Sequence, residues 1–392
     1  MGNTVIEKII RHNTGKDVKP GDIVTVNVDR VMIHDIFIPF VGDKFEEMGF
    51  TKLWDPDKVV LIYDHLVPAS QVDDTRHFHK GDEFAKKYGM KNVHRSDGIC
   101  HQLMTEAGYV KPGDVVFGTD SHTTTYGCVG AFSSGIGYTE MASILGTGTM
   151  WIKVPETIKV VIEGELPKNV MSKDIILRLI GDLGADGATY RALEFSGNTV
   201  ENMTVASRMT IANMAIEAGG KNGIFPVDEK TIEYLKEHSK RDFKVYEADP
   251  DAEYDEEYTI DLSELKPTVS FPHLPENTRT IDEVGDIAID QVVIGSCTNG
   301  RIEDMRIAAE ILKGRKVKKG LRCIVIPATQ AIYLQSMKEG LLETFIEAGA
   351  VVSTPTCGPC LGGYMGILAE GERCVSTTNR NFVGRMGHVD SE

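Results

Sequence analysis

The sequence predicts an α/β fold made of three α/β/α domains around a cleft, and three observations support this prediction. Short runs of β-branched residues alternate with amphipathic segments along the 392 residues, which is the order of elements in α/β layers. The apolar fraction is 41% and the charged fraction 26%, as in a globular protein with a substantial core. Polar, glycine-rich segments follow the strands, at the sheet edge where open α/β sheets bind ligands.

The first predicted domain covers residues 1–156. Apolar runs over 59–65 (VVLIYDH) and 114–120 (DVVFGTD) are predicted to be buried strands, and both end in acidic or His residues. The loops that follow them are DHLVPAS and GTDSHTTTYG. A change in sequence character near 152–157, around Pro155, marks the end of this domain.

The second predicted domain covers residues 157–278. Its regular elements are a strand over 158–166 and helices over 172–184, 206–218 and 228–240. Ser172 is expected to cap the first of these helices, and Gly184 to end it. The acidic run 247–258 is interpreted as a solvated excursion without chemistry. The Pro-rich segment 264–280 is interpreted as a linker.

The third predicted domain covers residues 279–392. Strands over 290–296, 321–329 and 350–356 are expected to alternate with helices over 301–313 and 331–348. Two of these strands lead into the loops GSCTNG and TPTCGPCLGG. Together with the two loops of the first domain, they are expected to converge on one cleft.

The charge balance restricts the partners. Lys and Arg number 42 and Asp and Glu 58, for a formal net charge of −16. Such a surface repels nucleic-acid phosphates and anionic lipids, so we expect neither nucleic acid nor membrane as a partner. The sequence has no run of about 18 apolar residues and no signal-peptide pattern, which predicts a cytoplasmic protein. An anionic substrate would then need positive charge concentrated at the site.

The seven cysteines decide between classes of site. Cys323 and Cys374 lie in or beside apolar strands and are interpreted as small buried hydrophobes. Cys297, Cys357 and Cys360 instead lie in small-residue loops that follow strands. An odd number of cysteines in a reducing compartment disfavours a disulfide framework.

Three interpretations compete for CGPC. A thioredoxin-like redox pair should open a regular helix, whereas Leu361, Gly362 and Gly363 follow here. A zinc site would need four ligands, and the spacing shows three. The third interpretation is a 4Fe-4S cluster on three thiolates, in which one iron keeps an open position and acts as a Lewis acid.

Six segments, in order along the chain, resemble the signature motifs of the aconitase family. They are DHLVPAS (64–70), GICHQ (98–102), GTDSHTTTYG (118–127), GSCTNGRIEDM (295–305), TCGPCLGG (356–363) and TTNRNFVGR (377–385). The resemblance extends over the whole chain and implies a hydro-lyase with three domains around the cluster. It assigns the 4Fe-4S cluster to Cys297, Cys357 and Cys360.

The resemblance also implies roles for the remaining site residues. Asp64 and His65 are expected to protonate the leaving hydroxyl. The other assigned positions are His101 paired with Asp120, His122, Ser121 and His34 at the pocket, Glu194 at the iron-bound water, and Asn379, Arg380 and Arg385 at the substrate carboxylates. The planar guanidinium of Arg suits carboxylate binding. Two guanidiniums would also supply the positive charge that an anionic substrate needs at the site.

A partner chain is expected as well. Single-chain members carry a fourth, swivelling domain with a serine base, and this sequence ends soon after NRNFVGR. The resemblance therefore implies a separate small subunit and an inactive isolated chain. The expected substrate is isopropylmalate, in leucine biosynthesis, with homocitrate and dimethylmalate as alternatives. Two other kinds of function, a CGPC thiol–disulfide protein and an RNA-binding sensor, remain open.

Overall fold

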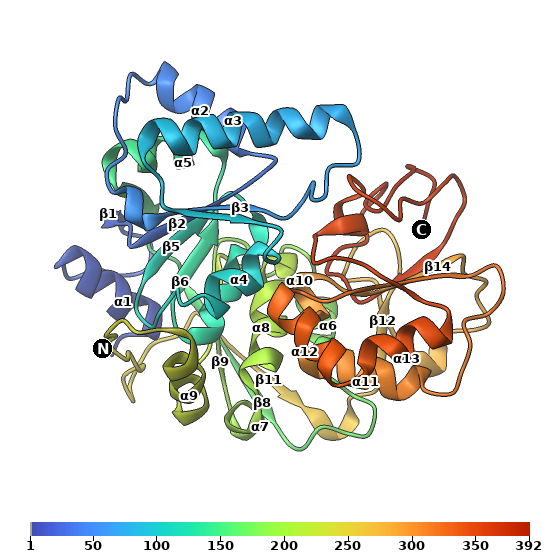
Figure 1. Ribbon diagram of the computed structural model, residues 1–392. Coiled ribbons are helices and arrows are strands. Elements are labelled where there is room, and N and C mark those ends of the chain that lie inside the picture. The colour runs from blue at the N-terminus through green and yellow to red at the C-terminus, as the bar shows by residue number, and fades with distance from the viewer. Residues whose placement is uncertain (1) are drawn as a thin grey trace.

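A computed structural model describes residues 2–392 as three parallel β-sheets with helices packed around them (Figure 1). This confirms the predicted α/β class. Two further sheets have two antiparallel strands each, β1 (Ile23–Asn27) with β7 (Thr149–Lys153), and β12 (Thr268–Ser270) with β13 (Thr278–Thr280). Among residues 2–392, none of the helices combines the length and the apolar character needed to span a membrane.

The first parallel sheet has the order β4-β3-β2-β5-β6. Its strands are β2 (Arg30–His34), β3 (Val59–Tyr63), β4 (Asn92–Arg95), β5 (Val115–Gly118) and β6 (Phe132–Gly135). Successive residues of β2 enter different cores: Val31 and Ile33 pack with Phe45 of α2 (Ile38–Glu47), whereas Met32 packs with Leu103 of α4 (Cys100–Glu106). The alternation of side chains along a strand thus places helices on both faces. Helices α3 (Val72–Tyr88) and α5 (Tyr138–Thr147) lie on the same side as α2 (Figure 1).

The second sheet has the order β10-β9-β8-β11. Its strands are β8 (Thr157–Glu163), β9 (Ala192–Ser196), β10 (Asn222–Ile224) and β11 (Glu256–Asp261), and its helices are α6 (Ser172–Leu183), α7 (Asn198–Asn202), α8 (Val205–Met214) and α9 (Glu229–His238). Ser172 is not the cap of α6, because the cap position is Met171, whose N–H donates to Oδ2 of Asp174 at 2.7 Å. Gly184 ends the helix as expected.

Two segments of this region differ from the prediction. The acidic run is largely exposed, as expected, but it is not irregular throughout, because its last residues begin β11, which pairs with β8 along Glu256–Asp261. The Pro-rich stretch was expected to be a linker, but it forms the β12–β13 hairpin. In both segments, backbone pairing with a distant or neighbouring strand overrides the local composition.

The third sheet has the order β16-β15-β14-β17. Its strands are β14 (Gln291–Gly295), β15 (Arg322–Ile326), β16 (Val351–Val352) and β17 (Cys374–Ser376), and its helices are α10 (Ser296–Asn299), α11 (Ile302–Leu312), α12 (Gln330–Lys338) and α13 (Leu341–Ala348). The prediction of a single helix over 331–348 is wrong, because the helix is interrupted at Gly340, whose φ is 73°. A left-handed residue cannot continue an α-helix, and glycine adopts that conformation at little cost.

The three proposed domains do not have three separate cores. One core joins residues from Met32 to Leu265 and so includes the first and second sheets. The cores of the third sheet contain only residues between Val292 and Met386. The boundary at 156 coincides with the start of β8, whereas the boundary at 278 falls inside β13. The division at 156 and 278 therefore stays a prediction.

The third sheet docks against the carboxyl ends of the first sheet's strands. The N–H of Cys357 donates to the carbonyl oxygen of Asp64, and the N–H of Ile99 donates to that of Ala328, both at 2.8 Å. The N–H of Gln330 donates to the carbonyl of Asp97 at the same distance. These backbone bonds bring polar loops from both sheets to one place.

Candidate active site

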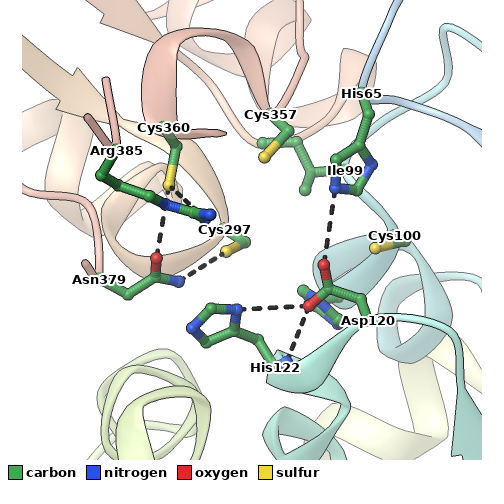
Figure 2. A pocket seen from close by; sticks show the side chains of 11 residues that line it. His65, Ile99, Cys100, Asp120, His122, Cys297, Cys357, Cys360, Asn379 and Arg385 are labelled. Carbon is green, nitrogen blue, oxygen red and sulfur yellow. Dashed lines mark hydrogen bonds and ion pairs between the residues drawn. The ribbon is translucent and has the colours of Figure 1, made fainter. Parts of the chain in front are cut away.

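The loops of the first and third sheets enclose a small cavity (Figure 2). Its walls come from segments more than 300 residues apart in the sequence. The lining residues are His65, Ile99, Cys100, His101, Asp120, His122, Cys297, Cys357, Cys360, Asn379 and Arg385. Nine of the fourteen expected site residues thus line this cavity.

Cys297 is presented by a strained turn. It follows β14 through Gly295 (φ 120°) and Ser296 (φ 68°), two successive residues with positive φ. A side chain at Gly295 would collide with the carbonyl oxygen of Ile326, so only glycine lets the neighbouring strand approach so closely. The turn points the thiol of Cys297 into the cavity, where the side chain is 4% exposed.

Cys357 directly precedes a short 3-10 segment, Gly358–Leu361, which contains Cys360 and ends at Gly362 (φ 72°). Neither cysteine begins an α-helix, which disfavours the thiol–disulfide interpretation because that chemistry depends on a helix N-terminus to stabilise the thiolate. Both thiols are buried.

Amide and guanidinium groups surround the sulfur atoms. Nδ2 of Asn379 and Nδ2 of Asn213 each lie 3.5 Å from Sγ of Cys297. Oδ1 of Asn379 lies 3.4 Å from Sγ of Cys360, and Nη2 of Arg385 lies 3.8 Å from the same sulfur. Nε of Arg385 is buried without a hydrogen-bond partner in the part of the chain that the structure describes.

The three thiols are not equally acidic. A hydrogen bond from Cys357 and the charge of Arg385 hold the pKa of Cys360 well below its usual range, whereas the same bond and burial raise the pKa of Cys357. Burial and the neighbouring Cys360 raise the pKa of Cys297 to about 11. Three sulfurs with N–H donors around them fit an iron–sulfur group, and binding it would release the protons that remain.

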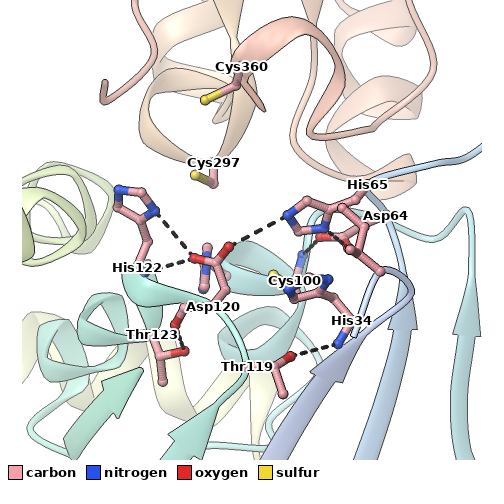
Figure 3. A network of polar contacts seen from close by, with 12 residues as sticks. His34, Asp64, His65, Cys100, Thr119, Asp120, His122, Thr123, Cys297 and Cys360 are labelled. Atoms are coloured by element: carbon pink, nitrogen blue, oxygen red, sulfur yellow. Dashed lines mark hydrogen bonds and ion pairs between the residues drawn. The ribbon is translucent and has the colours of Figure 1, made fainter. Parts of the chain in front are cut away.

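His65 forms a close pair with Asp64. Its Nδ1 lies 2.7 Å from Oδ1 of Asp64, while the N–H of Cys100 donates to Oδ2 of Asp64 at 2.7 Å (Figure 3). Burial alone would lower the pKa of His65, but Asp64 and Asp120 outweigh it and hold that pKa well above the usual value. His65 is therefore a buried imidazolium.

His34 stacks on His65 with the ring centroids 4.1 Å apart. Burial and the charge of His65 lower the pKa of His34 to about 3, so its imidazole is neutral. The ring does not line the cavity but supports the ring that does. His34 was expected at the pocket. The structure places it one layer behind the cavity wall, where it contacts His65.

Asp120 holds three histidines together. Its Oδ1 lies 2.8 Å from Nε2 of His101 and accepts the N–H of His122 at 2.8 Å, and its Oδ2 lies 3.6 Å from Nε2 of His65. Burial would raise the pKa of Asp120, yet the bonds from His101 and His122 hold it well below its usual range. Ser121 begins the following 3-10 helix, Ser121–Val129, beside the cavity but not on its wall.

Glu217 is a site residue that the sequence reasoning missed. Its Oε1 lies 2.7 Å from Nε2 of His122 and accepts a hydrogen bond from Nε of Arg380 at 2.7 Å. Glu217 is 4% exposed, and His122 and Arg380 keep its pKa below the usual value against the effect of burial. The available signal was an acidic residue in the otherwise apolar segment Ala215–Ala218, a 3-10 turn that directly follows α8.

Glu194 was expected at the iron-bound water, and the structure places it elsewhere. Its Oε2 accepts the N–H of Val5 at 3.0 Å, and its Oε1 accepts the hydroxyl of Tyr254 at 2.7 Å. The side chain projects from β9 toward the start of α1 (Val5–Thr14). There it accepts the N–H of Val5, one of the first N–H groups of the helix, which have no partner within the helix itself. Glu194 thus has a structural position, and Glu217 is the buried glutamate of the site.

The chain is similar to known proteins over almost its whole length. The profile of the aconitase family (aconitate hydratase) matches residues 7–286 and 281–391. The chain is similar to the 3-isopropylmalate dehydratase large subunit of Caldicellulosiruptor saccharolyticus, with 58% identity over 99% of this chain and 92% of that protein. The large subunits from Clostridium botulinum (strain Eklund 17B) and Moorella thermoacetica are 57% and 53% identical, each over 100% of this chain and 94% of the relative.

Among solved structures, the holo-form of aconitase X from Thermococcus kodakaraensis is similar in fold. The TM-score is 0.55 at 14% identity, and the match covers 99% of this chain and 93% of that one. At this level of identity the likeness concerns the fold alone.

Proposed function

This chain belongs to the aconitase family, and we propose that it is the large subunit of a 3-isopropylmalate dehydratase. In this function it interconverts 2-isopropylmalate and 3-isopropylmalate through 2-isopropylmaleate, a step of leucine biosynthesis. Relatives with that name are 53–58% identical over essentially the whole chain. The observation that carries the proposal is the convergence of three cysteine thiols and two His–Asp pairs on one cavity.

Cys297, Cys357 and Cys360 are the proposed ligands of a 4Fe-4S cluster. The cluster supplies a Lewis acid for the substrate's hydroxyl and neighbouring carboxylate, since three thiolates leave one of its irons without a protein ligand. The N–H donors of Asn213 and Asn379 at Cys297 support this assignment, because donors of this kind stabilise sulfur that carries negative charge.

His65 is the proposed general acid for the departing hydroxyl. An imidazolium that points into a cavity carries the proton that this step needs, and its charged state is supported by Asp64 and Asp120. His101 and His122 share the opposite side of Asp120 and fix the direction of that carboxylate. Neutral His34 supports the ring of His65 by stacking without adding a second positive charge.

Arg385, Arg380 and Asn379 are the proposed carboxylate-binding residues. Arg385 lines the cavity, and its Nε has no hydrogen-bond partner among residues 2–392, so its guanidinium has donors left for a substrate carboxylate. Arg380 is held by Glu217, which also contacts His122. Glu217 thereby links a carboxylate-binding side chain to the imidazole network, and we assign it a positioning role at this site.

A small subunit is the proposed second half of the active site. The relatives are named large subunits, and removal of a carbon-bound proton needs a base. Asp120, the carboxylate on the cavity wall, is already engaged with three histidines. We assign the base to the small subunit, as a serine of its swivelling domain, and expect the isolated chain to be inactive.

The test is anaerobic reconstitution with iron and sulfide, followed by addition of the small subunit. We expect about four irons per chain and hydration of 2-isopropylmaleate that requires both subunits. Cys297→Ser should lose the iron and the activity, whereas Cys323→Ser, in a strand away from the cavity, should keep both. An iron-free wild-type protein, or full activity of Cys297→Ser, would contradict the proposal. Faster turnover of homocitrate or 2,3-dimethylmalate would instead identify the chain as the large subunit of the dehydratase that acts on that substrate.

A further inference from the structure

Lys173 contacts the backbone just before two of the proposed site residues. It is the second residue of α6, and its Nζ donates to the carbonyl oxygens of Thr377 at 3.0 Å and Thr378 at 2.5 Å. These two residues follow β17 and directly precede Asn379 and Arg380. A side chain of α6 thus holds the backbone that presents two site residues just after β17.

Three properties of Lys173 are unusual for a lysine: its position in the helix, its lowered pKa and the lack of a carboxylate in direct contact. A cation in the first turn of a helix is unfavourable with respect to the helix dipole. Burial lowers the pKa of Lys173 to about 8, opposed first by the negative charges of Cys360 and Cys297 and then by those of the carboxylates Glu217 and Asp304. Within residues 2–392 no carboxylate lies within 4 Å of its ammonium. Departures of this kind concentrate at functional sites.

The same backbone segment also meets the Cys297 turn. The N–H of Gly295 donates to Oγ1 of Thr377 at 2.9 Å, and Nδ2 of Asn379 lies 3.5 Å from Sγ of Cys297. A displacement of residues 377–379 would therefore move contacts of two cysteines, since Asn379 also lies beside Cys360. Lys173 holds this segment in place through its two hydrogen bonds to backbone carbonyls.

We propose that Lys173 is a positioning residue for the iron–sulfur group, which fixes the Thr377–Thr378 backbone and offsets the negative charge gathered by three thiolates. This inference rests on the proposed function. A 4Fe-4S core of charge 2+ on three thiolates has a net charge of 1−, and reduction makes it 2−. A fixed ammonium nearby favours both retention of the group and its reduced form, because net charge and hydrogen bonds set cluster potentials.

The experiment compares anaerobically reconstituted wild type, Lys173→Met and Lys173→Arg, each with the small subunit present. Lys168→Met is the matched control, since Lys168 is an exposed lysine in the loop just before α6. One readout is the reduction midpoint potential of the cluster, followed by electron paramagnetic resonance. The other is the half-life of its visible absorbance in the presence of a chelator. Neither readout requires turnover.

We expect Lys173→Met to have a more negative midpoint potential and to lose its absorbance about tenfold faster, as expected for the loss of one buried charge. Lys173→Arg keeps the charge, so its potential should stay near that of wild type, while its KM rises because the longer side chain displaces Asn379 and Arg380. Lys168→Met should match wild type in every readout.

A wild-type potential and half-life in Lys173→Met would overturn the inference and leave the proposed function intact. A wild type that takes up no cluster would overturn both. If Lys173→Met does not fold, as judged by circular dichroism, Lys173→Arg decides: an unchanged KM, or a potential that falls with the charge retained, contradicts the proposal. Lower thermal stability alone, with unchanged potential, KM and half-life, also identifies a merely structural role.

Discussion

The backbone carbonyl oxygen of Asp64 accepts a hydrogen bond from the N–H of Cys357 at 2.8 Å, although the two residues are almost 300 positions apart. The hydroxyl of Thr356 donates to the same oxygen, also at 2.8 Å. Asp64 in turn holds His65, the proposed acid, and Cys357 is a proposed cluster ligand. The proposed proton donor and the proposed cluster ligand are therefore parts of one hydrogen-bonded unit that joins the first and third sheets.

Thr356→Val should loosen this unit without removing it, because the N–H of Cys357 still satisfies the carbonyl of Asp64. The same hydroxyl also accepts the N–H of Gly358 at 3.3 Å, so we expect a loss of about 1–2 kcal/mol in the free energy of unfolding, the typical net contribution of one or two hydrogen bonds. A fall in kcat with iron content retained should accompany it. Urea unfolding and steady-state kinetics measure the two effects. Thr354→Val, in the same segment, is the control, and equal behaviour of the two variants would contradict the role of the hydroxyl.

Glu217→Gln and Glu194→Gln form a matched pair that tests which glutamate belongs to the site. Glu217→Gln removes the charge between His122 and Arg380, so we expect kcat to fall about 100-fold or more with the cluster retained. Glu194→Gln weakens only the contacts with Val5 and Tyr254, so activity should change less than about twofold. Kinetics with iron analysis measures both variants, and a reversed order would restore Glu194 to the site.

Asp120→Asn should shift the pH dependence of activity. Asp120 contributes to the raised pKa of His65, so loss of its charge lowers that pKa. A general acid must be protonated, hence activity on the alkaline side should begin to fall at a lower pH than in wild type. The maximal rate should also drop, by about 100-fold. The measurement is kcat/KM against pH; an alkaline limb that stays in place would show that His65 is not the acid.

Asp114 should impose a pH dependence on stability that is independent of the cluster. Burial raises its pKa to about 6 despite Arg241, so the folded state binds the proton more tightly than the unfolded state does. The contribution is favourable at low pH and is lost as pH rises from about 4 to about 6, by an amount on the order of 2–3 kcal/mol.

Asp114→Asn removes this ionisation. The stability of the variant relative to wild type should therefore increase between pH 4 and pH 7, whatever its constant offset. Urea midpoints of the chain without cluster, measured across this range, give the difference. Asp286→Asn, at an exposed position, should show a constant difference from wild type. A flat difference for Asp114→Asn would mean that Asp114 ionises normally in the folded chain.

The regular elements were accessible from the sequence because their signals are local. Apolar β-branched runs such as 59–63 predict buried strands, and a stop signal such as Gly184 ends a helix within one turn of where it stands. One error arose where a distant strand decided the outcome, and another where a local hydrogen bond did. The acidic residues of β11 became a strand because β8 offers a pairing edge, and Met171 replaced Ser172 as the cap because Asp174 bonds its N–H.

The sequence by itself determined the α/β class and, through ordered motifs, the identity of most candidate site residues. Only the tertiary structure decided which acidic and basic side chains face the cavity. Glu194 and Glu217 are both glutamates in apolar surroundings, and local pattern cannot separate them. The separation comes from what packs opposite each one: the start of α1 at Glu194, and His122 with Arg380 at Glu217. Contacts between residues far apart in the chain are set by the packing of whole sheets, and no local signal encodes them.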